Sequence, residues 1–443
     1  EGNFGCVTCH AFNNIEPHLD APPYAPWGQT GTLMANAARD PVFWGAVALA
    51  AQDSPGDTED CIRCHSPAAF ANGNQAAIAM DELTGVELEG INCDFCHRQV
   101  WDGITEAGNA QYEIDDVLDM ATMTVPKRGP WAYEAGTHMG HPTLQDVSFL
   151  GTSRFCGTCH DVTTPVERVD DDGVGMGFDF NEQRTYSEWR NSAYFDVGSD
   201  PKSCQDCHMP AVDDIAGCTE HQGQHAHATG GRRHDLVGAN RFMVEMLKQE
   251  YGSQGSNQIA DLYYNTTLEY MDAFLPTSAS LELTAPEEVD LSAGLPQLDV
   301  RVTNETGHKL PTGYSEGRIM WIEVAARYQD QLVWSSGLWD QASGMQEDAQ
   351  LRTYEAVAEE WGSGIHFHLL LNNRWVLDNR IPAKAMAPDP QTDPVGDRYE
   401  LLTPTSELLK AEHPLAATLV WRSMITFALQ NNRAKRYRHA ARH

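Results

Sequence analysis

The apolar and polar positions of this 443-residue chain follow two different patterns, which meet near residue 275. Before that point, short segments with helical spacing of apolar residues alternate with long irregular stretches. Apolar spacing predicts four helices in this first part, at Asp40–Gln52, Thr185–Tyr194, Asp235–Tyr251 and Asn257–Phe274. Pro276 should end the last of them, since proline cannot continue a helix. The first part is therefore expected to be mostly helical or irregular.

After Pro276 apolar and polar residues alternate, with turn residues between the runs. Three runs show this most clearly, at Leu298–Thr303, Ile319–Tyr328 and Leu332–Trp334. Such alternation is typical of half-buried strands in an antiparallel β-sandwich. We therefore expect three parts: a mostly α or irregular domain at 1–252, a linking helix at 253–276, and an all-β sandwich-like domain at 277–443.

Ten of the eleven cysteines fall into five copies of the pattern C-x-x-C-H. At this composition, chance would give about 0.01 such matches in a chain of this length. The copies comprise Cys6, Cys9 and His10; Cys61, Cys64 and His65; Cys93, Cys96 and His97; Cys156, Cys159 and His160; and Cys204, Cys207 and His208.

C-x-x-C-H is the attachment site of a c-type haem. One tight turn presents two thiols to the two vinyl groups of a porphyrin, and the adjacent imidazole becomes the proximal iron ligand. A structural zinc site would pair two C-x-x-C units without needing a histidine after each, and a thioredoxin-like motif occurs once. The motifs thus predict five haems c, ten thioether cysteines and five proximal histidines. Cys218, outside the motifs, is expected to be a buried small apolar residue.

The second axial ligands must come from other histidines. Seven spare histidines lie before residue 240, where five distal ligands are required, and five of them are the candidates: His18, His138, His141, His225 and His234. His18 lies in an extended Pro-rich stretch that lets it reach an iron other than the adjacent one. One of His138 and His141 is expected to be surplus. His225 shares a Gly-rich loop with two other histidines, and this loop supplies one ligand or none.

Charge and hydropathy restrict the remaining possibilities. The formal net charge of −33, most of it before residue 276, argues against nucleic-acid binding. The longest apolar stretch, Val42–Ala51, is too short to span a bilayer. The chain starts at Glu1 without a leader and is interpreted as a mature exported form. Because haem thioethers form outside the cytosol, we expect a secreted, extracellular, periplasmic or cell-surface protein.

Segments along nearly the whole chain resemble large multihaem c-type cytochromes related to tetrahaem carriers of the hydroxylamine-oxidoreductase and nitrite-reductase superfamily. The matching segments are Met34–Trp44, Cys61–Pro67, Gly90–Arg98, Phe155–Asp161, Tyr186–Trp189, Cys204–Pro210, His234–Asn240, Gly307–Gly313 and Asp378–Pro382. The resemblance implies that His234, in H-x-x-x-G-x-N, is a distal ligand. It also implies that His308, in H-K-L-P-T-G, bends back to a haem; a plain turn histidine is the alternative. The C-x-x-C-K motif of the nitrite reductases is absent.

Three functions fit these motifs. The first is electron transfer through bis-His haems, to redox partner proteins or extracellular acceptors. The second is an oxidoreductase with one open haem, acting on a small nitrogen or sulfur compound. The surplus of histidines favours the first, so we expect no enzyme activity. The third is a homo-oligomeric cytochrome filament, or nanowire; the haem motif at the chain start, His18 and the basic segment after Asn432 predict head-to-tail assembly.

Overall fold

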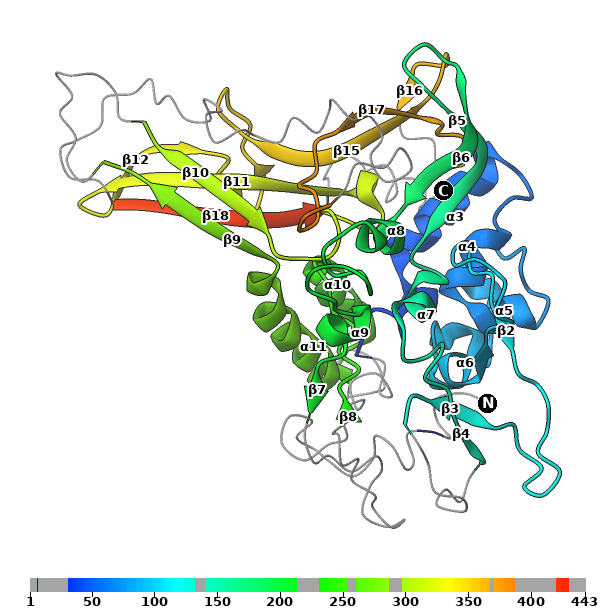
Figure 1. The fold of residues 1–443 in the computed structure, drawn as a ribbon. Helices are drawn as coiled ribbons and strands as arrows, with labels where there is room; N and C mark the ends of the chain where they lie inside the picture. Colours follow the sequence, from blue (N-terminus) through cyan, green and yellow to red (C-terminus); the bar gives the residue numbers. More distant parts are fainter. Residues whose placement is uncertain are drawn as a thin grey trace. The chain divides into compact units, whose positions relative to one another are not determined.

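The computed structural model describes residue 6 and residues 31–131, 141–212, 231–252, 260–286, 297–366, 370–386 and 420–429 (Figure 1). The chain divides into two compact units. Unit 1 comprises Glu1–Thr163, Tyr194–Leu275 and Arg436–His443, and unit 2 comprises Thr164–Ala193 and Pro276–Lys435. This division differs from the expected one, because a segment from between the fourth and fifth Cys motifs belongs to unit 2.

The described part of unit 1 is built from short helices and two-stranded pairs. Its α-helices are α3 (Pro41–Asp53), α4 (Glu59–His65), α5 (Pro67–Ala71), α6 (Cys93–Arg98), α7 (Ser153–Gly157), α9 (Cys204–His208), α10 (Arg241–Tyr251) and α11 (Ala260–Phe274). Its 3₁₀ turns are η1 (Ala37–Arg39), η2 (Met80–Glu82), η3 (Gly85–Glu89) and η5 (Leu275–Thr277). Its strand pairs are β1 (Gln99–Val100) with β2 (Glu113–Ile114), β3 (Lys127–Gly129) with β4 (Thr143–Gln145), and β7 (Ala211–Val212) with β8 (Gly231–Arg232).

Local sequence explains where the longer helices begin. The Asp40 side chain accepts hydrogen bonds from the backbone N–H groups of Val42 and Phe43, and Pro41 occupies the first turn of α3. This confirms the helix predicted from Asp40. Helices α10 and α11 bury one shared apolar cluster that includes Met243, Leu247 and Met271.

The helix predicted from Asp235 is wrong in its first turns, because α10 begins only at Arg241. Leu236 has a φ of 45°, which a right-handed helix does not allow. Its N–H donates to the carbonyl of His208 at 2.9 Å, a contact from outside the segment. The predicted helix at Thr185–Tyr194 likewise ends early, since α8 spans Thr185–Arg190. A tertiary hydrogen bond from Ala193 N–H to the Lys384 carbonyl replaces the helical one.

The described part of unit 2 is mainly β-structure. Besides α8 and the 3₁₀ turn η6 (Ser315–Gly317), it contains β5 (Val162–Val169), β6 (Gly175–Gln183), β9 (Ala279–Thr284), β10 (Asp299–Asn304), β11 (Arg318–Tyr328), β12 (Gln331–Ser336), β13 (Trp339–Asp340), β14 (Gly344–Met345), β15 (Thr353–Glu360), β16 (Ile365–His366), β17 (Arg374–Asp378) and β18 (Val420–Leu429). The strands predicted at 298–303, 319–328 and 332–334 correspond to β10, β11 and β12.

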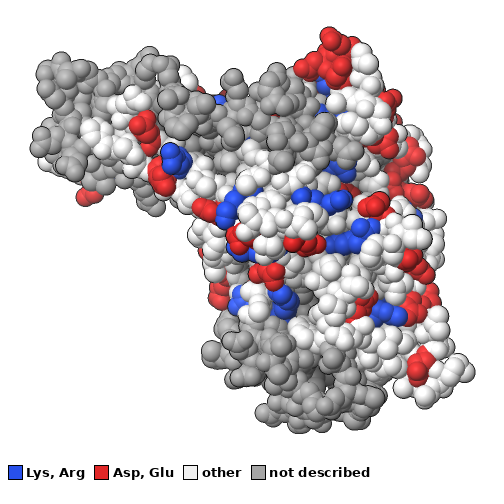
Figure 2. All heavy atoms as spheres, in the orientation of Figure 1, with Lys and Arg blue, Asp and Glu red and all other residues white. Residues whose placement is uncertain are grey.

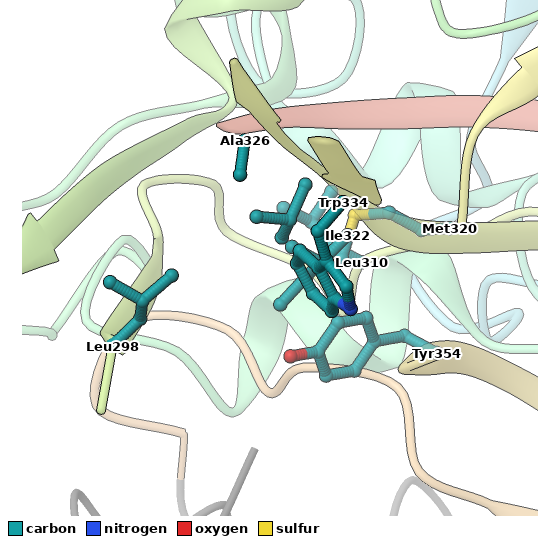
Figure 3. Packing of buried hydrophobic residues seen from close by; sticks show 8 residues of the cluster. Leu298, Leu310, Met320, Ile322, Ala326, Trp334 and Tyr354 are labelled. Carbon is teal, nitrogen blue, oxygen red and sulfur yellow. The ribbon is translucent and has the colours of Figure 1, made fainter. Parts of the chain in front are cut away.

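The largest described sheet has six strands in the order β12-β11-β15-β16, with β17 beside β15 and β18 beside β11. Alternate residues of β11, including Met320, Ile322 and Val324, enter a core with Trp334 and Tyr354 (Figure 3). Side chains of the separate β9–β10 pair pack against the same core. The other face of β11 is buried too, since Ile319, Trp321 and Ala325 are at most 8% exposed.

The hairpin β5–β6 joins unit 2 through contacts that are remote in sequence. Phe180 packs with Ala356, Ala358 and Trp375, and the Val169 N–H donates to the carbonyl of Asn373. Local apolar patterns do not report pairing across about two hundred residues, which is why the sequence places this segment with its chain neighbours. Among the described residues, no helix combines the length and apolarity needed to cross a lipid bilayer.

Candidate haem sites

Four of the five C-x-x-C-H motifs are described, and each lies on or directly after a short helix: α4, α6, α7 and α9. Two of these helices have side-chain caps in the sequence. Asn92 accepts from the backbone N–H of Phe95 at the start of α6, and Ser203 forms a capping box with Asp206 in α9. Three residues make about one helical turn, so the two thiols of each motif project from one side of the backbone. This is the geometry that thioether attachment of a porphyrin requires.

The ring nitrogen Nδ1 of two motif histidines faces a backbone carbonyl. In His97 it lies 2.5 Å from the carbonyl oxygen of Arg128, and in His208 it lies 3.0 Å from that of Val237. A carbonyl only accepts hydrogen bonds, so Nδ1 carries the proton and donates. The lone pair is then on Nε2, which is the tautomer that coordinates a metal.

His65 is held neutral by its surroundings. Burial lowers its pKa to about 4, the backbone of Ala37 opposes this shift, and the charge of His160 adds to it. Its ring also stacks on Phe43, with centroids 3.9 Å apart and planes 5° from parallel. A neutral, oriented imidazole is the form that binds iron.

The ring of His97 lies near that of the predicted distal ligand His234. Their ring centroids are 6.4 Å apart and their planes differ by 30°. An imidazole nitrogen bonds a transition metal at about 2 Å and the ring centre lies about 1 Å behind it, so two rings on opposite sides of one iron have centres about 6 Å apart. The pair therefore has the separation that two axial ligands of one haem iron need.

The segment after β8 holds His234 in this place. Its Nδ1 lies 3.1 Å from the carbonyl of Arg232, so the same tautomer argument applies to it. Three residues further, the carbonyl of Val237 accepts from His208. One short segment thus provides a candidate ligand near the third motif and a hydrogen-bond acceptor for the fifth.

The motifs also lie close to one another. The thiol of Cys93 shares a hydrogen bond with Cys6, which together with burial raises its pKa, and Cys156 and Cys204 form a similar pair. Burial raises the pKa of Cys96 to about 12. These contacts bring the first motif beside the third, and the fourth beside the fifth.

Tyr112 lies between the second, third and fourth motifs. Its hydroxyl donates to the Arg63 carbonyl at 3.2 Å, and its ring meets that of Phe95 edge-on at 4.8 Å between centroids. Burial raises its pKa, and the neighbouring Cys159 and Cys64 raise it further. The sequence gives no signal for this residue, because a single tyrosine in an irregular segment forms no pattern.

The other predicted ligands are described in part. His308 lies in unit 2, where its Nδ1 is 3.1 Å from the Lys309 carbonyl and 3.2 Å from the Thr306 hydroxyl, and burial lowers its pKa. His141 has its Nδ1 3.0 Å from the Pro142 carbonyl. Cys9, His10, His18, His138, His225 and Cys218 lie outside the described residues, as does the basic segment at the chain end.

Three comparisons place the chain among known proteins. The model of a family of unknown function (DUF6880) matches residues 378–443. None of the curated proteins matches the sequence. The fold is similar to that of a penta-haem cytochrome c552 from Thermochromatium tepidum, with a TM-score of 0.51, 17% sequence identity, and coverage of 97% of this chain and 99% of that chain. The likeness extends over both units.

Proposed function

We propose that this protein is a multihaem c-type cytochrome that transfers electrons through five covalently attached haems. The observation that carries the proposal is the pair His97 and His234, at the separation of two axial ligands and with both Nδ1 atoms directed at carbonyls. The five motifs and the fold likeness to a penta-haem cytochrome support it. The fold class we propose is a multihaem domain followed by an all-β sandwich-like domain.

Each group of residues has a defined role in this proposal. The ten motif cysteines attach the porphyrins, the five motif histidines bind iron on one side, and distal histidines bind it on the other. The carbonyls of Arg128, Val237 and Arg232 orient the imidazoles and increase their basicity, which is one way in which a protein tunes a haem potential. His308, with its Nδ1 also at a carbonyl, is proposed as a further distal ligand.

Bis-His ligation leaves no open coordination position, so we propose that the protein is not an enzyme. Haem thioethers form outside the cytosol, so the partners of this protein would be redox proteins or extracellular acceptors in that location. Filament assembly through His18 stays a prediction from the sequence.

Replacing His234 with methionine tests the proposal. The isolated wild-type protein should give a pyridine haemochrome count of five haems per chain and low-spin ferric spectra. The His234→Met protein should keep five haems, while one of the five changes its axial ligand, giving a charge-transfer band near that of His/Met haems or a high-spin signal. His366→Ala, in strand β16, is the control and should leave the spectra unchanged. A count of four or fewer, or unchanged spectra in His234→Met, would contradict the proposal.

A further inference from the structure

Residues 115–126 form the loop that joins β2 to β3 (Figure 1). Several of its apolar side chains are exposed. Val117, Leu118, Met120 and Met123 are 75%, 46%, 78% and 60% exposed. All four lie within seven residues. Isolated exposed apolar residues are ordinary, but a contiguous group of them marks a contact surface.

Hydrogen bonds at the tip give this loop a defined shape. The Asp119 carboxylate accepts from the backbone N–H groups of Ala121 and Thr122, at 3.0 and 2.9 Å. The Asp119 N–H donates to the Thr124 carbonyl, and Met123 adopts a φ of 57° to close the turn. The apolar side chains are therefore presented on a preorganised turn, which reduces the entropy that binding would cost.

The base of the loop is tied to the third haem motif. The Asp115 N–H donates to the Arg98 carbonyl at 2.9 Å, and the Asp115 carboxylate accepts from the Arg128 guanidinium at 2.5 Å. Arg98 directly follows His97, and Arg128 supplies the carbonyl that orients the His97 ring. The carboxylate of Asp116, the next residue of the loop, also pairs with the Arg98 guanidinium. The loop is thus connected on both sides to the histidine of a candidate haem.

The loop itself carries three acidic residues and no basic one, while Arg98 and Arg128 at its base pair with Asp116 and Asp115. Asp116, with a side chain 82% exposed, lies beside the apolar residues, and the exposed Glu113 precedes the loop in β2. Figure 2 shows further acidic side chains on the face in view, and the whole chain carries a net charge of −33. Most of a second copy of this chain, apart from the basic segment after Asn432, would bring a like charge to this surface. A partner with a basic surface would be attracted and steered to it.

We propose that residues 115–124 form the docking loop for a basic electron-transfer protein, which meets this chain beside the third haem motif. The inference rests on the proposed function. The apolar tip supplies the water-excluding contact, and the acidic residues supply long-range attraction that weakens with salt.

Binding can be measured without electron flow. The probe is a basic mitochondrial-type cytochrome c with its iron replaced by zinc, titrated against the haem-loaded protein by calorimetry. We expect salt-sensitive binding that weakens about tenfold in Met120→Ser/Met123→Ser. The matched control is Val197→Ser, which removes an equally exposed apolar side chain of unit 1, 85% exposed, and should bind as the wild type does. Glu113→Lys should slow association and flatten the salt dependence.

Several outcomes would overturn the inference: wild-type affinity in the double variant, equal weakening by Val197→Ser, or binding that is insensitive to salt. Sedimentation could also show that the wild type self-associates and that the double variant does not. That result would assign the loop to contact with a second copy and overturn the proposal of a basic partner. The haemochrome count of the same samples separates these results from failure of the proposed function, since the latter shows as missing haem.

Discussion

Four charged side chains form a buried network in unit 2, and removing one of them should destabilise this unit strongly. Lys309 Nζ lies 3.1 Å from Asp378, and Arg380 contacts both Asp378 at 2.7 Å and Glu188 at 3.1 Å. The side chains of Lys309, Asp378 and Glu188 are fully buried, and that of Arg380 is 5% exposed. The two positive charges of Lys309 and Arg380 balance the two negative charges of these carboxylates. Lys309→Met keeps most of the side-chain volume and removes one positive charge.

The expected cost follows from the charge that is left behind. Breaking a buried ion pair by removing one partner costs about 3–5 kcal/mol, because an uncompensated charge stays in the interior. Asp378 retains Arg380 at 2.7 Å, so we expect the lower end, about 3 kcal/mol. By contrast the exposed pair Arg301–Glu282, with side chains 61% and 67% exposed, should contribute less than about 1 kcal/mol.

Urea unfolding followed by far-ultraviolet circular dichroism measures the difference. With a slope of about 2 kcal/mol per M, the midpoint of unit 2 should fall by about 1.5 M in Lys309→Met. Arg301→Ala is the matched control and should shift the midpoint by less than about 0.5 M. Equal midpoints for Lys309→Met and the wild type would refute the claim that the network must stay neutral in the interior.

Two further predictions concern pH and assembly. Burial alone would raise the pKa of Asp378, but Arg380 and Lys309 lower it to about 2, below its ordinary value of 3.8. The contribution of Asp378 to stability is therefore present above pH about 4 and lost as the pH falls through 2. The Asp378→Asn protein should be less stable than the wild type at pH 5, and its stability should change less between pH 4 and 2. The sequence predicts that the protein sediments as head-to-tail oligomers and that His18→Ala sediments as a monomer; a monomeric wild type, or unchanged assembly of the variant, would end the filament hypothesis.

What the sequence predicted well is what depends on short-range chemistry. The cysteine motifs are local patterns, and the described copies lie on short helices, two of which have caps that can be read from Asn92 and Ser203. The apolar pattern at 319–328 located β11, which is buried on both faces. That His234 is a haem ligand stays a prediction, and its ring centroid lies 6.4 Å from that of His97.

The remaining features depend on backbone groups and on distance along the chain. The oxygens that orient His97, His208 and His234 are main-chain carbonyls, which every residue has, so no residue type at positions 128, 237 or 232 signals the role. The irregular backbone at Leu236 likewise carries no residue-type signal: its φ of 45° lies outside the helical range, and its N–H donates to the carbonyl of His208. The segment Asp235–Asn240 is non-helical and contacts His208 through the Leu236 N–H and the Val237 carbonyl, so tertiary contacts override its helical apolar spacing. Local irregularity of this kind, in a segment whose apolar spacing suits a helix, is itself a signal that the segment serves a site.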